Sequence, residues 1–136
     1  MKDTDKAYIA GLIDGEGSIM IQRIHRSTYP SPVVSVTSTT IEILHYLKDL
    51  IGHGTITKKT NYNPEKHKDC YTYILTYDKA IDLLKDIYPY LIIKIKKERA
   101  KLIIDEYKSV TLRNGRYSKE QLALKIDFYN IFMSIK

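Results

Sequence analysis

Apolar and polar residues recur along this chain with two periods, one typical of helices and the other of strands. Alternating segments bounded by Gly, Pro, Asn or Ser predict strands over 18–26, 33–38, 55–60 and 70–76. Apolar residues spaced three and four apart, with capping residues at the ends, predict helices. These helices are Lys6 to Ile13, one capped by Thr39 or Thr40 and stopped by Gly52, one from Tyr77 or Asp78 to about Tyr88, Leu91 to Tyr107, and one from a Ser118–Gln121 capping box to about Ser134.

The order of these elements is helix, two strands, helix, two strands and three helices. Two hairpins that alternate with helices predict an α+β domain with a four-stranded antiparallel sheet. Helices should cover one face of this sheet and leave the other face open. No internal repeat or linker interrupts the pattern, so we expect residues 1–136 to form a single domain.

Composition narrows the setting and the class of partner. The net charge of +6 suits an anionic partner, with nucleic acid or an anionic membrane surface as the usual candidates. No apolar run is long enough to span a membrane, and the polar N-terminus does not resemble a signal peptide. The single cysteine, Cys70, cannot form an intramolecular disulfide. We therefore expect an intracellular protein, cytoplasmic or organellar, that is neither secreted nor bound to a membrane.

Small residues share one side of the first predicted helix. Ala7, Ala10, Gly11 and Asp14 follow the spacing that places residues on one helix face. A glycine inside a helix costs about 1 kcal/mol relative to alanine, so close approach of another backbone is the usual reason for its presence. That backbone belongs either to the domain's own sheet or to a second copy of the helix, and the spacing alone favours neither.

Two acids at the end of this helix bear on that choice. Asp14 and Glu16 lie where the helix dipole is already negative, so a cation is needed to make them favourable there. If the small-residue face packs against its own copy, four carboxylates converge, and a divalent metal would neutralise them. Oxygen ligands are preferred by Mg²⁺, Mn²⁺ or Ca²⁺ rather than zinc. Such a site indicates metal-assisted hydrolysis of phosphodiesters.

The segment that contains these residues resembles the defining motif of a known family. Residues 9–17, Ile-Ala-Gly-Leu-Ile-Asp-Gly-Glu-Gly, closely resemble the motif of the LAGLIDADG homing endonucleases. Residues 50–56 and 87–100 are similar to further family segments, and most of 5–107 is covered in the expected order. The resemblance implies an αββαββα core whose open sheet face lies along the major groove of double-stranded DNA. Because the chain holds one copy of the motif, it also implies a homodimer and a palindromic or near-palindromic target.

The resemblance also implies roles for individual residues. Glu16 matches the metal-binding acid, which is usually Asp in the family, and the Gly15 carbonyl would be a further ligand of Mg²⁺, with Mn²⁺ able to substitute. Asp14 matches an acid with a more structural role at the dimer interface. Lys96 aligns with a lysine near the active site, where it could stabilise developing negative charge. Ser38 falls near a polar position that orients solvent around the metal.

Strand alternation selects the side chains of the open face. Ile19, Ile21, Val34 and Val36 mark the core side of the first two strands, and the residues between them point outward. Polar residues on an open sheet face can contact base edges and phosphates, although an ordinary solvated face shows the same alternation. The predicted DNA-binding residues are Ser18, Met20, Gln22, Arg26, Ser35, Thr37, Thr55, Thr57, Lys59 and Thr72.

Three functions remain open on these observations. The first is a site-specific DNA endonuclease that acts as a homodimer through Glu16, Lys96 and Ser38. The second is an RNA-binding intron maturase, a splicing cofactor on the same fold without cleavage activity. The third is a transcriptional regulator, but such proteins usually carry an additional DNA-binding domain. The complete motif, the acids and Lys96 favour the endonuclease.

Overall fold

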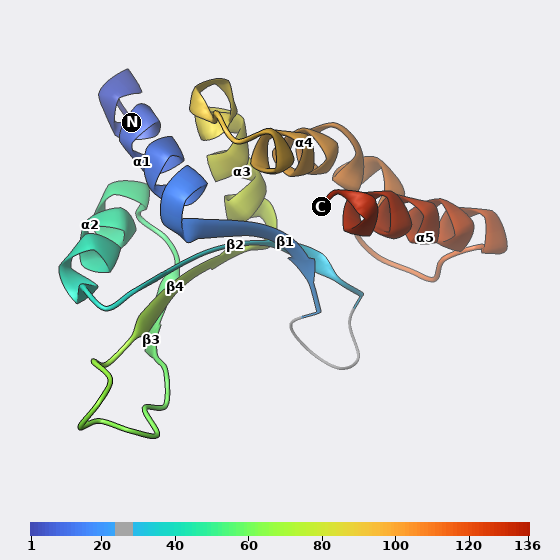
Figure 1. Cartoon of the computed structure of the whole chain (residues 1–136). Coiled ribbons are helices and arrows are strands. Elements are labelled where there is room, and N and C mark those ends of the chain that lie inside the picture. Colours follow the sequence, from blue (N-terminus) through green and yellow to red (C-terminus); the bar gives the residue numbers. More distant parts are fainter. Residues whose placement is uncertain (24–28) are drawn as a thin grey trace.

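The computed structural model describes residues 1–23 and 29–136, and its elements follow the predicted order (Figure 1). Helix α1 leads into two strands, helix α2 into two more, and three helices complete the chain. Short helical turns, Tyr88–Tyr90, Ile103–Tyr107 and Lys108–Val110, connect the later helices. The elements are α1 (Asp3–Glu16), β1 (Gly17–Gln22), β2 (Ser31–Ser38), α2 (Ile41–Ile51), β3 (Thr55–Lys58), β4 (Tyr71–Thr76), α3 (Tyr77–Ile87), α4 (Lys94–Leu102) and α5 (Lys119–Ser134).

The four strands form one antiparallel sheet in the order β1-β2-β4-β3. Helices α1, α3 and α4 lie on one side of the sheet, and no element of the described chain covers the other side (Figure 1). The predicted α+β fold with an open sheet face is therefore confirmed. Helix α5 lies beside the sheet rather than over it, beyond the end at which β1 and β2 are joined.

The core lies between the sheet and the helices above it. Alternate strand residues point into it, as the periodicity predicts, and Tyr73 and Leu75 of β4 are both buried. The Tyr73 hydroxyl donates a hydrogen bond to the His53 carbonyl at 2.5 Å, and burial raises the pKa of Tyr73 to about 12. Its ring lies so close to Gly54 that a Cβ at that position would be 2.5 Å from a ring carbon. The turn before β3 therefore requires glycine at this position.

Helix α1 is longer than the sequence predicts. It begins at Asp3 and continues through Gly15 to Glu16, instead of ending at Ile13. Gly15 stays in the helix, where a Cβ would have nothing within 4 Å. The chain leaves the helix at Gly17, whose backbone is extended, and glycine is needed there because a Cβ would lie 2.8 Å from the Ile13 Cα atom. Only the second of the two glycines is needed for the exit.

Other boundaries also differ from the predicted ones: β2 begins two residues earlier, at Ser31, and β3 ends two residues earlier, at Lys58. Strand β1 ends at Gln22, and the predicted continuation to Arg26 enters residues 24–28, which lie outside the described part of the chain. The predicted helix Leu91–Tyr107 starts only at Lys94, because Ile93 is extended, with φ −68° and ψ 120°. Among the described helices, none is long and apolar enough to cross a membrane.

Candidate active site

The end of α1 is bound to the beginning of α4 by two side chains. The Asp14 carboxylate accepts hydrogen bonds from the backbone N–H groups of Ile92 at 2.8 Å and Ile93 at 3.2 Å. In the opposite direction, the Lys96 ammonium donates to the carbonyls of Ile13 at 2.6 Å and Asp14 at 2.5 Å. An anion thus lies at the start of α4 and a cation at the end of α1, and both complement the helix dipoles.

Glu16 does not take part in this junction. It is the last residue of α1, one step before the exit at Gly17, and it is exposed. Helix ends leave four carbonyls without partners inside the helix, and Lys96 binds the first of these, that of Asp14, together with the Ile13 carbonyl, which also accepts the Gly17 N–H. The next carbonyl along the helix is that of Gly15. The two predicted metal ligands, this carbonyl and the Glu16 carboxylate, therefore follow directly after the carbonyls that Lys96 binds.

The residues described here hold no group of three His, Cys, Asp or Glu side chains close enough to bind a metal ion. Glu16 is an exposed carboxylate at the last residue of α1, where helix-end backbone carbonyls lie close by in the chain. Carboxylate and carbonyl oxygens are the donors that Mg²⁺ and Ca²⁺ accept.

The outer side of α1 is lined by small residues. Ala7 and Gly11 are exposed, and a Cβ built on Gly11 meets nothing within 4 Å. Packing inside the chain thus does not explain the glycine, which the sequence had left open. Ala10, which helical spacing places on the same side, is instead 0% exposed in the chain's own core. It therefore has no surface to offer a partner. Asp14 is half-buried and engaged by α4.

Apolar side chains flank this small-residue side. Tyr8 of α1 and Tyr46 of α2 pack edge to face, with ring centroids 5.7 Å apart, and both remain about half exposed. Next to Asp14, Ile92 is 82% exposed and Ile93 is 45% exposed. The sequence prediction missed the two isoleucines because it placed them inside a helix, although an apolar run before a basic helix was visible.

Ser38 lies at the end of the sheet where α1 enters β1. Val36 pairs with Gly17, and Ser38 follows two residues beyond it. Its hydroxyl accepts a hydrogen bond from the Thr40 N–H at 2.9 Å, an interaction that stabilises the turn into α2. The structure therefore gives Ser38 a local partner.

The register brings most predicted face residues together on the open side of the sheet. Ser18, Ser35 and Thr55 share one cross-strand row with Ile74, which the prediction did not name. A second row joins Thr37, Thr72 and Thr57, and the first two hydroxyls are hydrogen bonded at 3.0 Å. Thr72 is only 9% exposed, so its neighbours shield it. Lys59 lies one residue beyond β3, and the predicted Arg26 lies outside the described residues.

Several basic side chains of α4 have partners within the chain, unlike those of a helix face that contacts only solvent. Lys94 and Lys101 form exposed ion pairs with Glu98 at 3.8 Å and Asp105 at 2.8 Å. The Arg99 guanidinium lies over the Phe132 ring, 5.5 Å from its centroid, and donates to the Ile135 carbonyl at 2.9 Å. Together with Lys96, Arg99 attaches α4 to its neighbours rather than to solvent.

The model of the family described as "LAGLIDADG endonuclease" matches residues 9–135. The match covers nearly the whole chain, including the α1–α4 junction and the sheet. The chain belongs to the LAGLIDADG endonuclease family. The motif at the end of α1 and the C-terminal helix α5 both lie within the matched range.

Solved structures of two homing endonucleases and a meganuclease have the same fold at low sequence identity. The homing endonuclease I-CvuI, in complex with its target in the presence of Ca, superposes with a TM-score of 0.72 and 18% identity, covering 98% of this chain and 83% of that one. An archaeal intron-encoded homing endonuclease complexed with DNA gives 0.66 and 20%, covering 100% and 86%. The meganuclease I-SmaMI, bound to uncleaveable DNA, gives 0.65 and 17%, covering 93% of this chain but 44% of that one.

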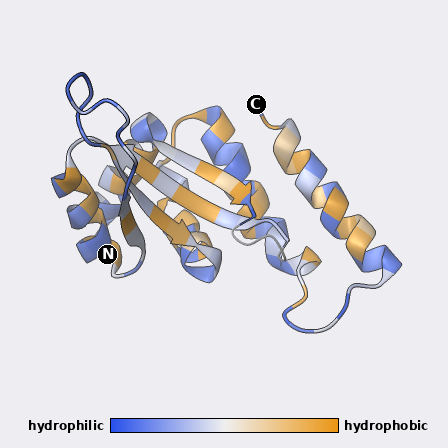
Figure 2. Ribbon diagram, turned by 90° about the horizontal axis from the view of Figure 1, so that it is seen from below, coloured by the Kyte–Doolittle hydropathy of each residue, from blue (hydrophilic) through white to orange (hydrophobic). Residues whose placement is uncertain are grey.

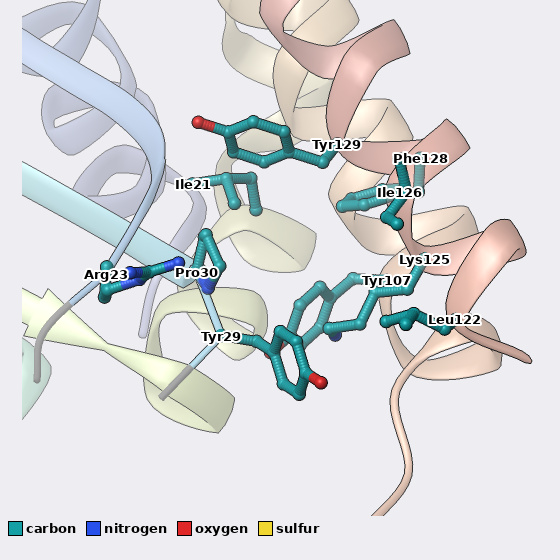
Figure 3. A pocket seen from close by; sticks show the side chains of 10 residues that line it. All are labelled: Ile21, Arg23, Tyr29, Pro30, Tyr107, Leu122, Lys125, Ile126, Phe128 and Tyr129. Atoms are coloured by element: carbon teal, nitrogen blue, oxygen red, sulfur yellow. The ribbon is translucent and has the colours of Figure 1, made fainter. Parts of the chain in front are cut away.

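A pocket on this LAGLIDADG chain lies away from the predicted site. Its volume is about 380 Å³, and it lies between α5 and the ends of β1 and β2 (Figure 3). The Lys125 side chain at its wall is buried, donates to the Thr111 hydroxyl at 2.9 Å, and lies 5.0 Å from the Tyr107 ring centroid. Of the predicted site residues that the structure describes, none lines this pocket. Aromatic faces and one hydroxyl thus hold the lysine in place.

Proposed function

We propose that this chain is a site-specific, double-stranded DNA endonuclease that acts as a homodimer on a long palindromic or near-palindromic site. The observation that carries the proposal lies on the outer side of α1. There, an exposed acid, Glu16, ends a helix whose exposed Gly11 has no explanation inside the chain. Both features make sense if a second copy of α1 packs there.

The dimer rests on the shape and chemistry of this side. Gly11 and Ala7 let two helix backbones approach closely, while Tyr8, Tyr46 and Ile92 supply apolar area on either flank. A two-fold axis through this side makes the surface self-complementary, as a homodimer requires. The coverage of I-SmaMI supports the idea, because that chain has room for a second unit of this size.

The residues fit a divalent cation. Glu16 and the Gly15 carbonyl would hold Mg²⁺, or Mn²⁺ in its place, together with their copies in the second chain. The bound metal supplies a Lewis acid that stabilises the attacking and leaving oxygens of phosphodiester hydrolysis. Structures of I-CvuI with DNA in the presence of Ca and of Mg support this choice. Glutamate instead of the family's usual aspartate carries the same charge on a side chain one methylene longer.

Lys96 acts by positioning. Its ammonium binds the carbonyls of Ile13 and Asp14 and so sets the direction in which the next carbonyl, that of Gly15, and the Glu16 side chain leave the helix. Ser38, at the same end of the sheet, would contribute a hydroxyl to the solvent around the metal.

The open sheet face would lie along the major groove. The strands would present side chains to the base edges, and the basic loops at the ends of the sheet would contact the phosphates. Three of the superposed structures contain DNA, which supports the same use of the fold here.

Glu16→Gln tests the proposal. A duplex that binds in Ca²⁺ is first selected from a randomised library, and its cleavage is then measured in Mg²⁺. We expect Glu16→Gln to reduce cleavage by about a thousandfold while affinity in Ca²⁺ stays within about threefold. The matched control is Glu42→Gln, an exposed glutamate on α2, which should cleave normally. Tight binding of a structured RNA without cleavage of any duplex would instead identify a maturase and overturn the endonuclease.

A further inference from the structure

The open face of the sheet carries no charged side chain on its strands. The register of the four strands assigns the outward positions without ambiguity. Most of them are hydroxyl residues, one is an amide, and three are aliphatic. These positions are Ser18, Met20 and Gln22 of β1, Ser31, Val33, Ser35 and Thr37 of β2, Thr55 and Thr57 of β3, and Thr72, Ile74 and Thr76 of β4. Ser31 and Val33 are each only 2% exposed, so they offer almost no surface to a base.

This composition limits which bases the face can recognise. The commonest specific contact to guanine is a bidentate pair from Arg or Lys, and neither residue is present on these strand positions. The methyl group of thymine is instead recognised by apolar contact, including contact with threonine methyl groups, and adenine by Asn or Gln. The face offers the second kind of chemistry in each of its rows, and Gln22 supplies the amide.

The aliphatic side chains occupy the middle of the face. Met20 pairs with Val33, which pairs with Thr76, and the adjacent row contains Ile74. Met20 and Ile74 are half-buried by their neighbours and present the rest of their surface to the open side. In the third row, Thr37 and Thr72 bond to each other, which uses one hydroxyl proton that a base would otherwise accept.

Positive charge lies at the margins instead. The loop after β3 carries Lys59, Lys66 and Lys68, all exposed, and Arg23 is exposed just after β1. In Figure 2 the loop between β3 and β4 is deep blue, whereas the strands, coloured for the residues of both faces, are mostly orange and pale. Cations at the two ends suit the phosphate backbone, which is bound without regard to sequence.

We propose that the base pairs contacted by this sheet face are mainly A·T pairs, recognised through the methyl groups of thymine by Met20, Ile74 and the threonines. The target half-site would therefore be rich in A·T over the stretch that the strands cover. This inference rests on the proposed function, because it assumes that the open face lies in the major groove.

The first test is selection of bound duplexes from a randomised library in Ca²⁺, with the full chain. We expect one or more contiguous blocks of A·T pairs in each half-site. Blocks dominated by G·C would overturn the inference and leave the endonuclease intact. A chain that selects no duplex would overturn the proposed function itself, so the two failures are distinguishable.

The second test separates methyl contacts from the shape of A·T-rich DNA. Deoxyuridine in place of thymidine removes only the methyl group, and we expect affinity to fall about fourfold for each methyl that is buried on binding. In a Met20→Ala, Ile74→Ala variant the penalty for uracil should shrink, whereas Ile126→Ala, an exposed isoleucine on α5, should keep it in full. Equal binding of the thymine and uracil duplexes by the unmodified protein would overturn the inference.

Discussion

The two sides of helix α1 differ in what holds them. On the side toward α4, Asp14 and the last carbonyls of the helix are occupied by partners from the same chain: Ile92, Ile93 and Lys96. On the outer side, Gly11 faces open space and Glu16 is exposed. One side of the same short motif thus has hydrogen-bond partners within the chain, and the other side is an exposed surface.

This difference indicates which residues of α1 contribute to stability and which contribute to function. A side chain with partners in its own chain lowers the free energy of the folded state, and its loss should lower the free energy of unfolding. A costly residue without such a partner is kept for something outside the chain. We therefore expect substitutions on the α4 side to change stability and substitutions on the outer side to change assembly and activity.

The largest effect should come from Gly11→Leu. A leucine side chain separates two packed helices, so dimerisation should weaken by more than a hundredfold and cleavage should be lost. The folded monomer should remain, because a Cβ at this position contacts nothing in the chain. Sedimentation velocity measures the assembly, and Asp127→Leu on the exposed side of α5 is the control. A dimer unaffected by Gly11→Leu would place the interface elsewhere.

Lys96→Met should be the most destabilising change on the α4 side. It removes two charge-assisted hydrogen bonds to helix-end carbonyls, at a cost of about 3 kcal/mol. Urea unfolding of the variant in the monomeric Gly11→Leu background measures this without the contribution of assembly. If cleavage falls in the dimeric variant while the free energy of unfolding is unchanged, the lysine acts directly on the substrate and the positioning role is wrong.

Alanine substitutions at the two glycines that end the motif, Gly15 and Gly17, should change the free energy of unfolding in opposite directions. Gly17→Ala forces a Cβ against the Ile13 backbone at 2.8 Å and should cost about 2 kcal/mol. Gly15→Ala adds a methyl to open space within a helix and should stabilise the monomer by about 1 kcal/mol. Thermal unfolding of the pair, again in the Gly11→Leu background, provides the comparison. Equal destabilisation by both would show that the helix ends earlier than Glu16.

Asp14→Asn should have the smallest effect. The amide oxygen can still accept one of the two hydrogen bonds from Ile92 and Ile93, so a loss of about 1 kcal/mol is expected. Urea unfolding of the Gly11→Leu monomer measures this loss, and cleavage by the dimer should fall far less than in Glu16→Gln. A loss of cleavage as large as that of Glu16→Gln would show that the role of Asp14 is catalytic and not structural.

The sequence predicted element types better than element ends. Alternation identified the open face, including Thr72 outward and Tyr73 inward, because the period of a strand determines both faces at once. It misjudged the end of α1, since Gly15 and Gly17 look alike in sequence and only the distance to Ile13 distinguishes them. Ala10 was misplaced for a similar reason: helical spacing groups neighbouring residues, but the boundary between buried and exposed depends on what packs against the helix.

The sequence by itself determined the order of elements, the two faces of the sheet and the family, because these follow from periodicity and from a contiguous motif. The tertiary structure decided which motif residues are engaged. Lys96 lies 82 residues from Asp14 along the chain, yet binds its carbonyl. No local pattern encodes such a contact, because it forms only where the packing of α4 on the sheet brings the two helix ends together.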